Sequence, residues 1–567
     1  MKGRGNYWTQ GLHRAYTRRQ VLGGAVKAGL GLTGLSILGC AATPAASTPT
    51  KAPAAPPSPA TPTVAAPRAT PTPAAKVLDQ LVVALGRDIP TLDGHPQPTH
   101  ADGANFYDLV YDALTVLDRD FKLAPSLATS WKPSPDGKVW EVKLRTGVKF
   151  HNGEEFDAET VKFNIERTQK PELKAGQLIY WKDVGVEVVA KDTVRIIYKE
   201  PYPLLPNRLA LVNVVPRQYI QANGDKIMAE KPIGTGPYKF VKWVKDDNFE
   251  IEWAGTSHFR VANPPAKRII HKVIPAEIGR IAALKTGLVD IISSVAPELL
   301  KEITDDPNLG ALVQPASSVP HISISLFKEG PLRDKRVRQA LNYAIDRQTI
   351  VKELFGGLYS VMNTLAIPLC FGYDATVPGY PYDPKKAKDL LAEAGYPKGF
   401  EMVYTLPSRA YPKYKEYNQA IANYWGEIGV KTTIKPETAS PSEWALPLRR
   451  DNKGPDGVYA GAGSCGGTFD MEDVLGTSLV NWDPKAGTGN TQYIEDAELD
   501  RLIMATKTTV DPEARRKLFA QALRRINEEA YAISLWTMTY NQGYNKKKIK
   551  VFRPRGYILA PWDIEVA

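Results

Sequence analysis

Hydrophobic and polar residues follow the periods of strands and helices through the body of the chain. An apolar run at residues 81–85 predicts a strand. Alternation over residues 139–144, directly after the turn signal Asp136-Gly137, predicts a second strand. Two glycines and a proline within residues 233–243 precede a third.

Helical periodicity is equally clear between these strands. Asp157 is placed to cap a helix that contains Val161. Residues 333–355 predict a helical segment, and Asp346 within it can cap a following helix. Five apolar residues of this segment share one face: Val337, Ala340, Leu341, Ala344 and Ile345. Strands and helices alternate to the end of the chain without an internal repeat, so we expect an α/β fold with mixed β-sheets.

Residues 1–39 have a different pattern, which is typical of an export signal. They carry six Lys or Arg and no acid, and six glycines interrupt the weakly apolar stretch at 21–39. A membrane span needs roughly 20 strongly apolar residues, so this stretch predicts a cleaved signal instead. Arg18-Arg19 resembles a twin-arginine motif, which leaves the Tat and Sec routes both open.

The signal ends in Ile37-Leu38-Gly39-Cys40, which resembles a bacterial lipobox. The lipobox cysteine is lipidated and becomes the first residue of the mature protein, so Cys40 is the expected lipidation site. The alternative is a buried helical cysteine. Ten prolines and thirteen alanines follow within residues 41–76, without an acid or an aromatic residue. Such a segment buries too little apolar surface to fold, so residues 40–76 are expected to form a disordered tether.

The distribution of charge argues against a nucleic-acid partner. The formal net charge is +11, but residues 1–76 hold nine Lys or Arg and no acid, which leaves +2 for residues 77–567. With 43% hydrophobic and 23% charged residues, the chain has the composition of a globular protein. A nearly neutral body offers a polyanion little electrostatic attraction.

Three ordered blocks carry a family resemblance. They read LAPSLATSWKPSPDGKVWEVKLRTGVKFHNGEEFDAETV at 123–161, GTGPYKF at 234–240 and RVRQALNYAIDRQTIV at 336–351. These blocks resemble signatures of the family 5 extracellular solute-binding proteins, the peptide/nickel-binding group that serves ABC importers. The resemblance extends over essentially all of residues 77–567.

The resemblance implies a bilobed clamp of the periplasmic-binding-protein kind, of type II and similar to cluster C. Such a clamp closes on its ligand by a hinge motion about two crossing segments. The ligand would be enclosed between domains I and III. The expected boundaries are 77–118, 229–318 and 532–567 for domain I, 119–228 for domain II, and 319–531 for domain III.

Two stretches match ligand-contacting loops of dipeptide receptors. Thr99 and His100 fall at contact positions of the first loop, although a surface loop with unremarkable residues fits equally well. Arg409 and Tyr411 resemble an Arg-x-Tyr pair whose arginine binds the ligand carboxylate. A guanidinium suits this role because its planar fork can hold both oxygens. The alternative is a solvated arginine beside exposed tyrosines.

A third stretch, residues 463–475, resembles the family loop in which an aspartate neutralises the amino terminus of a bound peptide. Gly467 stands where that aspartate is expected, so free-amine peptides are in doubt as ligands. An alternative alignment lets Asp470 take over the role. Gly466 leaves room for a wider ligand, and Phe469 is a candidate cleft aromatic. Trp444 is another, although it fits a core position as well.

The cysteines add one hypothesis. The chain has three cysteines and no CxxC pair, so a structural zinc site is not expected. Cys370 and Cys465 both fall in the expected domain III of an exported protein. We therefore expect a disulfide between them that pins the glycine-rich loop.

The expected function is that of a receptor that captures a peptide-like solute or an oligosaccharide and delivers it to the ABC permease. We expect a monomer without cofactor, metal or catalytic residue, anchored by lipid outside the cell membrane or in the periplasm. One alternative is a nickel or haem receptor of the same family, with His95 and His100 near the metal complex. The other is an exported hydrolase, but AGSCGG at 462–467 fails the GxSxG pattern.

Overall fold

The structure is a computed structural model. Three larger sheets organise the part of the chain that it describes. The described residues are 76–95, 101–118, 120–173, 178–255, 258–261, 263–316, 318–408, 411–437, 457–465, 469–478, 492–553 and 564–567.

The first sheet has seven strands and takes them from three separate parts of the chain. Parallel and antiparallel pairs both occur in it, so the sheet is mixed, as expected. Its strands, in spatial order, are β12 (Leu309–Pro315), β20 (Thr539–Asn545), β11 (Ile291–Ile292), β1 (Leu78–Leu85), β10 (Ala266–Val273), β9 (Asn248–Trp253) and β8 (Tyr238–Val244).

Strand β1 is buried on both of its faces, which explains its uninterrupted apolar run. Leu81 and Val83 belong to the same buried cluster as residues of α3 (Ala101–Val110). Val82 and Ala84 point to the other face, where they join residues of α9 (Glu277–Lys285) and α10 (Leu300–Thr304). Helices therefore cover the sheet on both sides.

The second sheet has four antiparallel strands and includes the strand expected at 139–144. Its order is β4 (Ala128–Pro133), β5 (Val139–Leu144), β7 (Thr193–Ile197) and β6 (Gly185–Ala190). Helix α4 (Ala158–Thr168) packs against it, with Val161 and Ile165 buried. The expected cap of this helix is present, because the Thr160 amide donates to Asp157 Oδ1 at 2.8 Å.

The third sheet has five strands, with helices on both of its faces. The strand order is β16 (Lys431–Pro436), β15 (Glu401–Leu406), β17 (Val458–Ser464), β13 (Ser318–Ile324) and β18 (Ala532–Ser534). One face carries α11 (Lys335–Tyr343), α12 (Arg347–Phe355), α13 (Pro384–Glu393) and α14 (Tyr414–Glu427). The other face carries α16 (Glu472–Ser478), α17 (Ala497–Thr508) and α18 (Pro512–Glu528).

The helical segment expected at 333–355 consists of two helices. Helix α11 ends at Tyr343, and α12 begins after Asp346, whose side chain accepts the Thr349 amide at 3.0 Å. The cap expected at Asp346 is thus confirmed. The five apolar residues expected to share a face are all buried, at 1% exposure or less.

The glycines before strand β8 permit a close approach of two backbones. A Cβ on Gly234 or Gly236 would collide with the backbone at the end of α3, at Leu109 and Val110. The Gly236 amide donates to the Val110 carbonyl at 3.0 Å. The GTGPYKF block therefore fixes the packing of β8 against α3.

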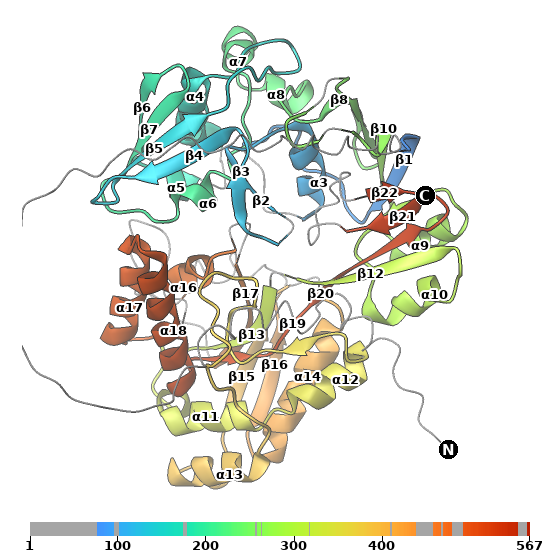
Figure 1. Cartoon of the computed structure of the whole chain (residues 1–567). Helices are drawn as coiled ribbons and strands as arrows, with labels where there is room; N and C mark the ends of the chain where they lie inside the picture. Colours follow the sequence, from blue (N-terminus) through green and yellow to red (C-terminus); the bar gives the residue numbers. More distant parts are fainter. Residues whose placement is uncertain are drawn as a thin grey trace, which may run out of the picture. The chain divides into compact units, whose positions relative to one another are not determined.

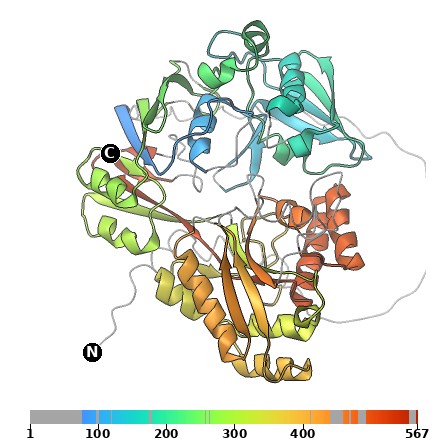
Figure 2. The same ribbon diagram turned by 180° about the vertical axis from the view of Figure 1, so that it is seen from behind.

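Two small two-stranded ribbons and the helices beside the four-stranded sheet complete the framework that bears on the site. Strand β19 (Trp536–Thr537) pairs with β14 (Ser360–Val361), and β2 (Thr115–Leu117) pairs with β3 (Leu123–Pro125). In Figure 2, α17 and α18 lie next to the end of the four-stranded sheet. No helix of the described residues is long and apolar enough to cross a bilayer.

Candidate functional site

Two backbone segments connect the seven-stranded and five-stranded sheets, and they are hydrogen-bonded to each other. One segment joins β12 to β13, and the other runs from β18 through β19 to β20 (Figure 1). The Ala316 amide donates to the Met538 carbonyl at 2.9 Å, and the Thr537 hydroxyl donates to the Ala316 carbonyl at 3.3 Å. A paired double connection of this kind can bend as one unit, which suits a hinge.

Asp470 lies beyond the end of β17, and its carboxylate is paired with an arginine of α18. The carboxylate is 2% exposed and accepts two hydrogen bonds from the Arg515 guanidinium, at 2.5 and 2.8 Å. It also accepts the Glu472 amide at 2.9 Å. The sequence offered Asp470 as a ligand-binding residue, but in the structure both of its oxygens are used internally.

A disulfide joins the loop before Asp470 to a second loop beside the five-stranded sheet. Cys370 and Cys465 are bonded, with their Cα atoms 6.0 Å apart. Beside them, the Phe371 amide donates to the Phe469 carbonyl at 2.7 Å and the Met471 amide donates to the Phe371 carbonyl at 3.1 Å. Covalent and backbone bonds together hold Cys465, Phe469 and Met471 in place.

Phe469 of the same loop faces the turn between β2 and β3. Phe469, expected as a cleft aromatic, contacts Phe121 with a ring-centroid distance of 4.4 Å. Both residues have positive φ, 53° for Phe469 and 58° for Phe121, a conformation that non-glycine residues seldom adopt. Neither would adopt it without surrounding constraints, so the contact is part of a defined geometry.

Glu472 and Asp473, in the first turn of α16, bind an arginine that precedes them by 264 and 265 positions. Arg208 donates to Glu472 Oε2 at 2.9 Å and to Asp473 Oδ1 at 2.6 Å. Arg208 is the last residue of α6 (Leu205–Arg208), and its side chain is 1% exposed. We call Arg208, Glu472 and Asp473 the latch. Sequence reasoning missed Arg208, because nothing in its local sequence marks a partner so distant.

The contact between the four-stranded sheet and the helices α16 to α18 extends beyond the latch. Gly137 forms the turn before β5 with φ of +69°, and a Cβ there would collide with the Val510 side chain. Val510 lies in the loop between α17 and α18. The turn signal that predicted strand β5 therefore also marks a point of close packing.

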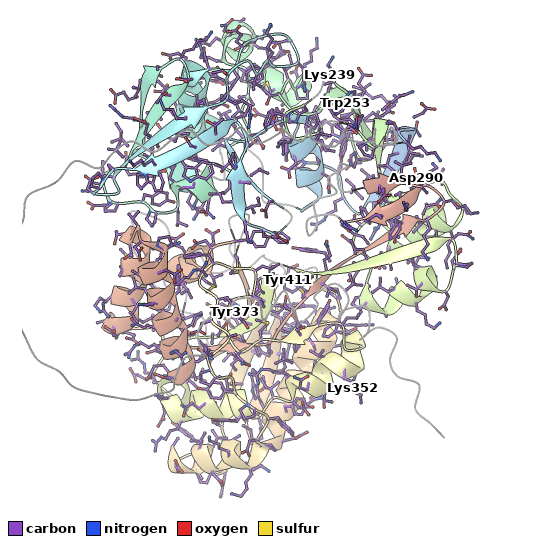
Figure 3. All side chains as sticks on the ribbon, viewed as in Figure 1. Lys239, Trp253, Asp290, Lys352, Tyr373 and Tyr411 are labelled. Carbon is purple, nitrogen blue, oxygen red and sulfur yellow. A yellow bond between two sulfur atoms is a disulfide. The ribbon has the colours of Figure 1, made fainter. Side chains whose placement is uncertain are left out.

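Tyr411 is the tyrosine of the segment that resembles an Arg-x-Tyr pair. Its side chain is half-buried, and its ring meets Tyr414 edge-on at 6.2 Å. Figure 3 places Tyr411 near the crossing strand β20. Lys413 next to it pairs with Glu298 at 3.1 Å, which ties this loop to the seven-stranded side. The ligand-binding role of Tyr411 remains a prediction.

Several expected site residues lie outside the described residues. These residues, whose roles remain predictions, are Arg409, Thr99, His100, Trp444, Gly466 and Gly467, together with the lipidation site Cys40 and the tether.

His95, considered as a contact for a metal complex, has both ring nitrogens engaged. Nε2 lies 2.9 Å from the Asn213 carbonyl, which can only accept, so Nε2 carries the proton. Nδ1 therefore accepts from Arg167 at 2.9 Å. Burial, together with the Arg167 charge, lowers the pKa of His95 to about 4. This part of the metal-receptor alternative is wrong, and the described residues contain no cluster of His, Cys, Asp or Glu able to hold a metal ion.

Comparison with known proteins gives the family. The family model for bacterial extracellular solute-binding proteins, family 5, matches residues 122–457, which is more than half of the chain. The chain belongs to this family. The family 5 fold expected from the three sequence blocks is confirmed.

Relatives of this family 5 protein span nearly its whole folded part. The glutathione-binding protein GsiB of Salmonella typhimurium is 30% identical over 465 residues, which covers 80% of this chain and 88% of the relative. Heme-binding protein A of Haemophilus influenzae is 28% identical over 473 residues, covering 78% and 83%. The crystal structure of NikZ from Campylobacter jejuni in complex with Ni(L-His) has a TM-score of 0.71 at 26% identity, covering 86% and 99%.

The family 5 assignment establishes the general role. The protein is a solute-binding receptor of an ABC importer, and its family acts outside the cytoplasm in transport rather than in catalysis.

Proposed function

We propose that this receptor captures a small, peptide-like solute with net negative charge. The observation that carries the proposal is the state of the three acids in the described part of the loop at 463–475. Asp470 is paired with Arg515, and Glu472 and Asp473 are paired with Arg208. None of the three is free to neutralise a ligand ammonium group.

The remaining loop position supports the same ligand class. Gly467 stands where the family aspartate is expected, and a glycine has no side chain to supply a counter-charge. An ammonium enclosed without a counter-charge costs several kcal/mol. Arg409, by its resemblance to the carboxylate-binding arginine, would favour an acidic group. A solute with one dominant anionic end fits both features.

Glutathione and acylated acidic peptides are the first candidates within this class. The relative GsiB is named for glutathione, a small peptide whose two carboxylates outnumber its one amine. In glutathione the amine lies beside a carboxylate of the same residue, so the ligand partly neutralises itself. An ordinary dipeptide has its two charged ends further apart and needs both of them satisfied.

We further propose that the receptor acts as a monomer, held at the outer face of the cell membrane, or in the periplasm, by lipid on Cys40. The lipobox-like sequence and the proline-rich residues 41–76 support this arrangement. Thirty-six residues in extended polyproline form could reach about 110 Å. Such a reach would let the receptor bind solute at a distance and return to its permease.

Calorimetry with the full-length protein tests the ligand class. We expect binding of glutathione or N-acetylated acidic peptides, and weak or no binding of free neutral dipeptides, oligosaccharides, haem and Ni(L-His). Arg409→Ala should weaken binding by about 1.5–3 kcal/mol, the value of a hydrogen bond to a charged group. The control Arg195→Ala removes an arginine of the four-stranded sheet that is 43% exposed, and it should change nothing. Tight binding of free dipeptides that is lost on N-acetylation would contradict the proposal.

A further inference from the structure

The segment from Phe469 to Asp473 is held from two directions. On the side of the five-stranded sheet, Asp470 pairs with Arg515, the Phe371 backbone binds Phe469 and Met471, and the disulfide holds Cys465. On the other side, Phe469 contacts Phe121, and the two acids of α16 pair with Arg208. The loop expected to face the ligand is therefore also in contact with the β2–β3 turn and with α6, which packs against the four-stranded sheet.

Arg208 is organised by its own surroundings. Its guanidinium lies 3.6 Å from the centre of the Tyr180 ring, and its Nε is 3.2 Å from the Tyr202 hydroxyl. A stacked arginine has fewer orientations to lose when an acid arrives. The site on the four-stranded side is thus prepared to receive the acids of α16.

The latch is buried enough for its charges to matter. The side-chain exposures are 1% for Arg208, 13% for Glu472 and 10% for Asp473. Exposed ion pairs contribute little, but breaking a buried pair leaves a desolvated charge without a partner. If the two sheets separate, water must enter between Arg208 and its acids. Separation rehydrates these groups, so its cost is the difference between the charge-assisted hydrogen bonds that are lost and the hydration that is regained, and it does not depend on contact with the ligand.

We propose that Arg208 is a positioning residue for ligand capture, which holds the ligand loop in its binding position through Asp473 and Glu472. The latch acts on ligand binding and so presupposes the proposed function. The four-stranded sheet then takes part in closure although it lies outside the expected cleft between domains I and III. Arg208 would mainly slow ligand release, because the bound state cannot open until the latch breaks.

The two acids should contribute unequally. Asp473 makes the shorter contact, at 2.6 Å against 2.9 Å. Burial raises the pKa of Glu472 even though Arg208 lies beside it, which means that the buried charge of Glu472 is poorly compensated. Asp473→Asn should therefore weaken the latch more than Glu472→Gln does.

The experiment uses the full-length protein with glutathione as probe. Arg208→Gln and Asp473→Asn should each raise the dissociation constant about ten- to hundredfold. The change should lie in the dissociation rate, while the association rate stays close to that of the wild type. The double variant should bind no more weakly than either single one, because both remove the same interaction. Arg195→Gln serves as a matched control in an exposed pair.

Ligand-free small-angle scattering separates failure of the latch from failure of the ligand class. If the wild type does not bind glutathione but Arg208→Gln has the larger radius of gyration, the ligand class is wrong and the latch stands. Equal radii together with equal affinities overturn the latch, and so do equal radii when the probe does not bind. Fully additive effects of the two substitutions, or weaker binding explained by an equal loss of unfolding free energy, also overturn it.

Discussion

At the scale of single residues, buried arginines connect segments that are distant in sequence. Arg167 binds Asp93, His95 and Asp225, while Arg515 binds Asp470. Each guanidinium has five donors in a fixed plane, so one side chain can satisfy several acceptors at once. Such networks keep polar groups satisfied where water is absent. They also commit individual acids to structure and remove them from ligand binding.

His95 makes the Arg167 network sensitive to pH. Its pKa is lowered to about 4 in the folded state, against about 6.5 when exposed. Between these values the unfolded chain binds a proton that the folded chain does not, so stability falls as the pH falls. We expect a loss of about 3 kcal/mol from this residue between pH 7 and pH 4.

Urea unfolding across this pH range checks the expectation. His95→Gln keeps a donor and an acceptor, so it should fold, and its stability should fall less steeply with decreasing pH. Burial also lowers the pKa of His271, to about 3. His271 is present in both proteins, so its effect on the pH dependence of stability is the same in both and does not disturb the comparison. Identical slopes for the wild type and His95→Gln would contradict the assignment.

At the scale of elements, short loops connect regular strands and helices whose local signals are strong. Asp157 and Asp346 cap their helices, and β1 is apolar because both of its faces are covered. The loop between β17 and α16 has no such regular pattern. The described residues between β17 and α16 are held by the Cys370–Cys465 disulfide, the Asp470–Arg515 pair and the latch.

The disulfide should stabilise the fold measurably. It links cysteines 95 residues apart, and a bridge of this kind typically adds about 2–4 kcal/mol by restricting the unfolded chain. Replacing both Cys370 and Cys465 by Ser should lower the unfolding free energy by that amount in a denaturant titration. Thiol titration of unfolded, unreduced protein should find neither cysteine free. Finding two free thiols in freshly isolated protein would refute the pairing.

At the scale of the whole molecule, the receptor role belongs to the folded residues, and anchoring is what we propose for the amino-terminal region. Residues 75–567 form one compact unit. Within it the two crossings between sheets are hydrogen-bonded through Ala316. This connection would allow the sheets to move as bodies while the latch and the ligand hold them together.

The anchoring prediction belongs to this scale. Cys40→Ala removes the thiol that would carry the lipid, so we expect either soluble, released protein or an uncleaved precursor. Membrane fractionation and mass spectrometry of the amino terminus distinguish these forms. Arg195→Ala, the control used for ligand binding, should be cleaved and anchored normally. A Cys40→Ala protein that is cleaved normally and stays in the membrane fraction would show the lipidation site to be wrong.

The sequence alone determined those features that depend on neighbouring residues. Apolar periodicity predicted β1, β5 and the helices between 333 and 355, because burial of one or both faces leaves a regular pattern. Helix caps followed from side chains within three residues of the amides that they bind. Three blocks in a fixed order sufficed for the family.

Only the tertiary structure decided which charged groups remain for the ligand. Asp470 looked available in the sequence, yet Arg515, 45 residues away, uses both of its oxygens. Asp473 is paired with Arg208, which precedes it by 265 residues. The energy of a buried charge depends on what surrounds it in space, and that environment is assembled from several distant segments. Local patterns therefore predict the elements, whereas the allocation of charges follows from how those elements pack.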